Sequence, residues 1–152
     1  MRCCLLLALG AFALFAAGSP SPDTLRGKLA IHENAPATVE TPDHKTVTLD
    51  GDETTLKVLT DRRLNGFQIE AKGKFTAPGK FTIGPSYQHS LLVRQNGKLK
   101  MITYWCDVCS IRDYTPGPCR CCQKETILDL RDPDAPEGKW RRRARSRCCF
   151  PL

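Results

Sequence analysis

Five cysteines lie close together near the C-terminal end of this chain, and the spacing of four of them is that of a metal site. Cys106 and Cys109 form one C-x2-C pair, and after nine intervening residues Cys119 and Cys122 form a second. Four thiolates bind zinc tetrahedrally at about 2.3 Å and leave no position open for a substrate. The pattern therefore predicts a structural zinc centre with Cys106, Cys109, Cys119 and Cys122 as its metal ligands.

The fifth cysteine of the group, Cys121, stands between the two members of the second pair. It could replace Cys119 or Cys122 as a ligand, point away from the metal, or form a disulfide with Cys148 or Cys149. The sequence leaves these three roles open, so Cys121 is kept as an additional candidate metal ligand.

Other chemistry of the same cysteines also has to be considered. In an exported protein the cluster could form two disulfides with one cysteine left over. Thiolates also bind other soft metals, such as Cu(I) or an iron–sulfur centre. A redox-active C-x-x-C at Cys106 and Cys109 would need a thiolate stabilised by a helix start, and no helix is predicted there. Haem attachment needs a histidine after the second cysteine, where Ser110 stands.

The N-terminal residues have the pattern of an export signal. One arginine precedes an apolar run from Leu5 to Ala17, and small residues lie before Ser19. This run is shorter than the roughly 20 residues that span a membrane, so we expect residues 1–18 to be a signal peptide that is removed on export. The mature protein is expected to be periplasmic or secreted, and Cys3 and Cys4 are expected to leave with the signal.

Six of the seven excess positive charges of the chain come from a short run near its C-terminal end. Six basic residues lie within 139–147, and without them and Arg2 the chain holds sixteen basic and sixteen acidic residues. A basic run of this kind is typical of a solvated tail, which can make weak contacts with anionic surfaces. We expect no nucleic-acid partner, because export separates the chain from nucleic acid. Residues 131–152 are predicted to be a disordered basic tail.

The region between the signal and the tail has the size of one domain, and it reads as mostly β. Apolar and polar residues alternate in 46–49, 56–58, 67–71 and 81–83, as in strands with one buried face. Asn96-Gly97 separates two further strand-like runs, 91–94 and 98–105, and favours a type I′ hairpin turn. Leu25 to Glu33 is expected to be the first strand. Only 60–66 suggests a helical turn, with Thr60 as its cap.

These elements resemble a known kind of domain. Leu64 to Gly73, followed by Gly79 to Ile83, resembles the compact OB-fold barrel of exported bacterial proteins, and the resemblance covers about Leu25 to Trp105. The segment after Trp105 resembles the cysteine-rich end of uncharacterised exported bacterial proteins and, in its spacing, a zinc ribbon. Zinc-ribbon knuckles carry a glycine after each second cysteine, where this chain has Ser110 and Gln123. The resemblance implies a binding face of the OB type.

We therefore expect an all-β protein: residues 19–24 as a linker, residues 25–130 as a small OB-like barrel that includes the cysteine cluster 106–122, and the tail. No phosphate-binding loop or catalytic triad is recognisable, and His32, His44 and His89 lack any motif spacing. The predicted function is that of an exported non-catalytic protein with a structural zinc centre and an unknown protein, peptide or saccharide ligand. Two alternatives are a disulfide-stapled module that binds an oligosaccharide or peptide, and a thiol oxidoreductase or metal carrier.

Overall fold

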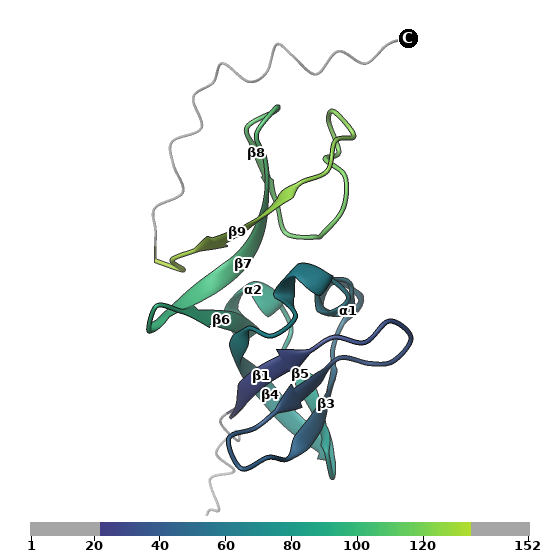
Figure 1. Cartoon of the computed structure of the whole chain (residues 1–152), viewed down its shortest axis with the longest axis vertical. Coiled ribbons are helices and arrows are strands. Elements are labelled where there is room, and N and C mark those ends of the chain that lie inside the picture. Colours follow the sequence, from purple (N-terminus) through teal and green to yellow (C-terminus); the bar gives the residue numbers. More distant parts are fainter. Residues whose placement is uncertain (1–21, 135–152) are drawn as a thin grey trace, which may run out of the picture.

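The computed structural model describes residues 22–134, and these residues form a small closed β-barrel with a sheet that extends from it (Figure 1). Five strands make the barrel, in the spatial order β1-β2-β3-β5-β4, and pairing between β4 and β1 closes it. The β3–β5 pair is parallel, and the other pairs are antiparallel. The barrel strands are β1 (Asp23–Ala30), β2 (Thr38–Glu40), β3 (Thr46–Asp50), β4 (Gln68–Ala77) and β5 (Lys80–Ile83). The predicted all-β class and small OB-like barrel are confirmed.

The helical residues of the barrel lie between β3 and β4. Helix α1 (Glu53–Leu59) begins at Asp52, whose carboxylate accepts a hydrogen bond from the Thr55 amide at 2.7 Å. A 3-10 turn, η1 (Arg62–Leu64), follows and is capped by Asp61. The predicted strand 56–58 is therefore wrong, because Asp52 caps a helix that contains these residues. The helical turn predicted at 60–66 is present only as η1, and Thr60 ends α1 instead of starting the turn.

Barrel closure depends on close contact between strands at Gly73. At this residue β4 pairs with β1 through Asp23 and with β5 through Ile83. A Cβ atom on Gly73 would lie 2.0 Å from the carbonyl oxygen of Thr82, so only glycine fits without a shift of the backbone. The buried apolar side chains of the barrel strands and of the segments packed against them form one core. Its largest fully buried members include Tyr87, Tyr104, Phe81, Leu29 and Leu49.

Beyond the barrel, a hairpin carries the chain toward the cysteines. Strands β6 (Leu91–Gln95) and β7 (Lys98–Cys106) meet at Asn96-Gly97, whose φ angles of 51° and 76° are those of a type I′ turn. The predicted hairpin is confirmed. Strand β6 pairs with β4, so the hairpin continues the barrel sheet. The distal half of β7 then pairs with two short strands, β8 (Ile111–Asp113) and β9 (Ile127–Arg131).

Several predicted boundaries differ from the structure. The first strand begins and ends earlier than the expected 25–33, and β2, β8, β9 and the short helix α2 (Tyr87–Ser90) were not predicted. Arg131, which was assigned to the disordered tail, is the last residue of β9 and pairs with Met101. The predicted signal peptide and almost all of the predicted tail lie outside the described residues. Within residues 22–134, no helix is long and apolar enough to span a membrane.

Candidate metal centre

The first cysteine pair lies at the tight turn between β7 and β8. Cys106 is the last residue of β7 and pairs with Ile111, the first residue of β8. The three residues after Cys106 turn the chain back, and Ser110 completes the turn with a φ of 53°. This left-handed conformation is the one that glycine adopts most readily. A serine therefore takes the glycine conformation of a zinc-ribbon knuckle.

The second pair repeats this arrangement in the loop before β9. The amide of Gln123 donates to the carbonyl of Cys119 at 2.9 Å, and the amide of Cys119 donates to the carbonyl of Lys124 at 2.8 Å. These two bonds close a tight loop around Cys121 and Cys122. Gln123 has a φ of 59°, so it also adopts the conformation expected of a knuckle glycine. The absence of glycine at positions 110 and 123 does not prevent either knuckle from forming.

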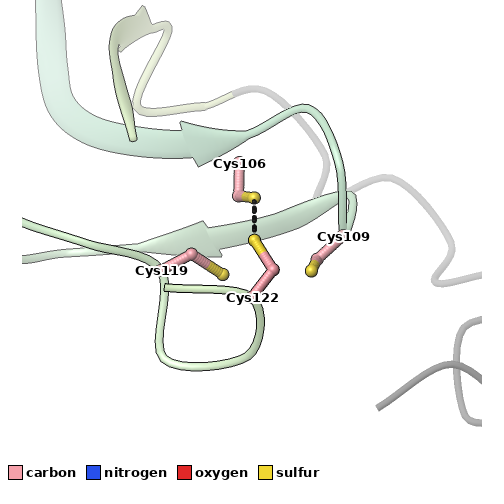
Figure 2. A group of neighbouring side chains, drawn as sticks. All are labelled: Cys106, Cys109, Cys119 and Cys122. Carbon is pink, nitrogen blue, oxygen red and sulfur yellow. Dashed lines mark hydrogen bonds between the residues drawn. The ribbon is translucent and has the colours of Figure 1, made fainter. Parts of the chain in front are cut away.

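The two knuckles face each other and bring four sulfur atoms together (Figure 2). The Sγ atoms of Cys106, Cys109, Cys119 and Cys122 all lie within 4.8 Å of one another, and those of Cys106 and Cys122 are 3.5 Å apart. Sulfurs bound tetrahedrally at about 2.3 Å from zinc are about 3.8 Å apart, whereas a disulfide requires about 2.05 Å. Cys106, Cys109, Cys119 and Cys122 form no disulfide with one another. The four-thiol group is thus compatible with a bound metal ion.

Burial differs systematically within each pair. The first member, Cys106 or Cys119, is buried, and the second, Cys109 or Cys122, is partly exposed. The Cys121 amide donates to the buried Cys119 Sγ at 3.4 Å, and backbone amides of Cys109 and Val108 act to lower the pKa of Cys106. Amides arranged in this way stabilise sulfur in its thiolate form, which is the form that binds a metal.

The pKa values of the thiols differ because each sulfur has different neighbouring thiols and backbone amides. Backbone amides of Cys122 and Cys121 lower the pKa of Cys119 to about 7. The thiols of Cys121 and Cys122 raise the pKa of Cys109 well above its usual range. For Cys106, the Cys109 amide lowers the pKa, but burial and the thiols of Cys122 and Cys119 outweigh it and the pKa is raised. A reactive C-x-x-C thiolate at Cys106 or Cys109 would require a lowered pKa, so these directions give no support to the oxidoreductase alternative.

Two side chains of the barrel hold the loop that carries the second knuckle. The guanidinium of Arg63, in η1, donates to the carbonyl of Thr126 at 2.7 Å and lies over the ring of Tyr104. The hydroxyl of the buried Tyr87, in α2, donates to the carbonyl of Tyr114. Together these bonds fix the loop on both sides of Cys119. Sequence reasoning missed both residues, because neither has a motif and their partners are backbone carbonyls.

The remaining candidate residues lie in different places. Cys121 is partly exposed beside the four-thiol group, and its amide donates to Cys119 Sγ at 3.4 Å. Cys148 and Cys149, its other predicted partners, fall outside the described residues. Tyr104 is fully buried, and Trp105 lies under the guanidinium of Arg112 at 5.1 Å from the ring centroid. His32 and His44 contact Thr38 and Glu40 in the barrel.

A second feature was not predicted from the sequence. An open depression of about 620 Å³ is bordered by the turn between β2 and β3 and by the β4–β5 hairpin. These two turns lie at the end of the barrel away from β8 (Figure 1). Phe75 lies in its wall with about half of its surface exposed. The ring of Phe75 contacts the buried Phe81 edge-on, at a centroid distance of 5.0 Å.

Comparisons with known proteins identify no relative. The chain matches no protein-family model, and no curated protein or solved structure is significantly similar to it.

Proposed function

We propose that this chain is an exported, non-catalytic protein in which a structural zinc ion, bound by Cys106, Cys109, Cys119 and Cys122, ties a C-terminal sheet to an OB-like barrel. The observation that carries the proposal is the convergence of four sulfurs from two knuckles within 4.8 Å. Four thiolates fill a tetrahedral coordination shell, so zinc bound there would contribute to folding rather than to catalysis.

The position of the site supports a structural role. Beyond its contact with β6, strand β7 is flanked by the short strands β8 and β9, and Cys106 and Cys119 are the only buried hydrophobic residues between 106 and 126. Small sheets with little core are commonly stabilised by a metal or by disulfides. Zinc bound at this point would link the β7–β8 turn directly to the loop before β9.

Metal content and thiol counts test this proposal on the full chain. We expect one equivalent of zinc and, within the cluster, thiols that react only after chelation or unfolding. Cys109→Ser should lose the metal and lower the melting temperature, whereas Cys121→Ser, the matched control, should keep one equivalent. One equivalent of iron or copper in place of zinc would contradict zinc as the bound metal but would support a four-thiolate metal site. Absence of any metal, with cluster thiols that stay unreactive in denaturant without reductant, would contradict the site and favour the disulfide alternative.

Export rests on the N-terminal sequence pattern and needs its own test. Expressed with its native N-terminus in a bacterium, the protein should accumulate outside the cytoplasm with Ser19 as its first residue. Cytoplasmic protein that retains Met1 would contradict this part of the proposal. It would leave the metal centre intact, since the reduced cytoplasm also permits four thiolates to bind zinc.

A second candidate function is saccharide or peptide binding at the depression beside Phe75. Exposed aromatic rings flanked by polar groups are a common feature of ligand sites, and Thr41, Asp43 and Lys45 border this one. Titration of isotope-labelled protein with soluble oligosaccharides and peptides should shift the amide resonances of these residues. Phe75→Ala should abolish the shifts, while Leu56→Ala, which removes another exposed apolar side chain on α1, should not. Shifts elsewhere, or none, would reject the site.

A further inference from the structure

Two arginines on the outer face of the barrel sheet share one buried carboxylate. Arg26 in β1 and Arg94 in β6 lie on either side of Glu70, because β1 and β6 both pair with β4. Both guanidiniums donate to the same oxygen, Glu70 Oε2, at 2.9 Å from Arg26 and 3.2 Å from Arg94. The Glu70 side chain is 9% exposed, whereas those of Arg26 and Arg94 are 65% and 43% exposed. One buried carboxylate thus holds two guanidiniums at the surface.

Two lysines extend this positive charge over the same face. Lys28 is two residues from Arg26 in β1, and Lys72 is two residues from Glu70 in β4, so all four side chains lie on one side of the sheet. Both lysines are exposed, and neither forms an ion pair within the part of the chain that the structure describes. We call Arg26, Lys28, Lys72 and Arg94 the cationic face. Its four cations and the single carboxylate of Glu70 leave a net charge of +3.

We propose that the cationic face binds an anionic polysaccharide, a polymer whose sugars carry carboxylate or sulfate groups. Guanidinium groups bind such oxyanions through paired N–H donors. Arg26 uses only its Nε to bind Glu70, so its two terminal nitrogens remain available to a ligand. Because Glu70 already fixes both arginines, less side-chain entropy is lost when an anion binds to them.

The composition of this surface favours a polysaccharide over other polyanions. The cations come from three neighbouring strands, and this spread suits a polymer with repeated anionic groups. Thr24 and Gln68 are exposed on the same face, where they can hydrogen-bond sugar hydroxyls. Among the described residues, no exposed aromatic or large apolar side chain belongs to the cationic face. Nucleic-acid bases would lack a stacking surface there, and a membrane would lack an apolar anchor.

Titration calorimetry of the full chain with polygalacturonate tests this proposal, with neutral dextran as the blank. Lys28→Gln/Lys72→Gln should weaken binding about tenfold, because two unpaired charges are lost while the two arginines stay in place. Lys57→Gln/Lys80→Gln, the matched control, removes the same charge from lysines that are already paired with carboxylates. The control should change the affinity less than about twofold.

The basic run at 139–147 needs a separate variant, because it attracts any polyanion by charge alone. In a full chain that carries Arg141→Gln, Arg142→Gln and Arg143→Gln, binding should be weaker overall. The tenfold difference between the lysine variant of the cationic face and its control should remain. Loss of this difference would assign the binding to the run and overturn the proposal.

The remaining outcomes also decide the proposal. Equal affinities of the lysine variant and its control would overturn it. Tighter binding of single-stranded DNA, or of phosphatidylglycerol vesicles, than of polygalacturonate through the same lysines would assign the face to nucleic acid or to a membrane instead. The choice against nucleic acid rests in part on the proposed export, whereas the zinc centre is independent of it. Metal content measured on the same samples should be unchanged in every variant, so failure here leaves the zinc centre standing.

Discussion

Ser110 and Gln123 occupy equivalent places in the two knuckles, each directly after the second cysteine of a pair, and both adopt left-handed backbone angles, with φ of 53° and 59°. Each therefore has the conformation that glycine supplies in a zinc-ribbon knuckle. The equivalence indicates that the two cysteine pairs form the same local structure twice, despite their unrelated intervening residues.

The left-handed conformation predicts how Ser110 responds to substitution. A residue with a Cβ atom is strained in this conformation by roughly 1–2 kcal/mol relative to glycine, and part of this difference is offset by the greater chain entropy of unfolded glycine. Ser110→Gly should therefore raise the free energy of unfolding by up to about 1 kcal/mol. Ser110→Val should lower it, because β-branched residues rarely adopt positive φ.

Chemical denaturation of the metal-loaded variants measures both effects. Gln123→Gly and Gln123→Val should give the same signs, since the second knuckle has the same geometry. A stabilising valine at either position would show that the residue does not hold the left-handed conformation.

Arg63 should contribute more to the free energy of unfolding than its neighbour Arg62. Arg63 donates to the Thr126 carbonyl and lies over Tyr104, whereas Arg62 forms an exposed ion pair with Glu33. Arg63→Lys should lower the free energy of unfolding by about 1 kcal/mol, because lysine cannot reproduce the planar contact and the directed hydrogen bond together. Arg62→Lys should leave the melting temperature unchanged. Equal melting temperatures for the two variants would contradict the role assigned to Arg63.

The metal-free, reduced protein should show one thiol that ionises near neutral pH. The folded state lowers the pKa of Cys119 to about 7 through the amides of Cys122 and Cys121. Because this pKa lies below that of the unfolded chain, Cys119 contributes stability that is complete above the unfolded pKa and is lost as the pH falls through about 7.

Thiolate absorbance followed against pH measures the ionisation of Cys119 directly. The titration step near neutral pH should disappear in Cys119→Ser and persist in Cys109→Ser, because the pKa of Cys109 is raised. A step near neutral pH that survives in Cys119→Ser would assign the low pKa to another cysteine.

Gly73 provides a test of barrel closure. A methyl group at Gly73 would lie 2.0 Å from the Thr82 carbonyl oxygen, whereas a methyl group at Gly79, where φ is 73°, meets no atom within 4 Å. Gly73→Ala should therefore displace a strand and lower the free energy of unfolding by about 1–3 kcal/mol or more. Gly79→Ala should cost about 1 kcal/mol from backbone strain alone. Thermal unfolding of the two variants compares them, and a smaller loss for Gly73→Ala would contradict the close contact.

The sequence predicted those parts of the fold that depend on local patterns. Asn96-Gly97 fixes its own turn by its backbone preference, so the β6–β7 hairpin and the position of Cys106 at its end could be anticipated. The same locality explains the error at 56–58, where a three-residue alternation is too short to distinguish a strand from a helix. The Asp52 side chain caps the first turn of α1, which contains these residues, and so favours the helix over a strand.

The parts that could not be predicted depend on contacts between distant residues. Strands β8 and β9 are short, and they form because β7 provides an edge on each side for them to pair with. Arg63 and Tyr87 act on carbonyls 63 and 27 residues away, which no sequence pattern records. The convergence of the cysteines follows from this pairing. Their spacing therefore predicted four candidate ligands, whereas their facing arrangement depends on the tertiary structure.

X-ray absorption spectroscopy at the zinc edge of the purified full chain is the most direct test of the zinc centre. The account predicts one zinc per chain with four sulfur neighbours at about 2.3 Å and no lighter ligand in the first shell. The Cys121→Ser variant should give the same spectrum. A shell containing nitrogen or oxygen, or a protein without zinc whose cluster sulfurs are paired as disulfides, would contradict it.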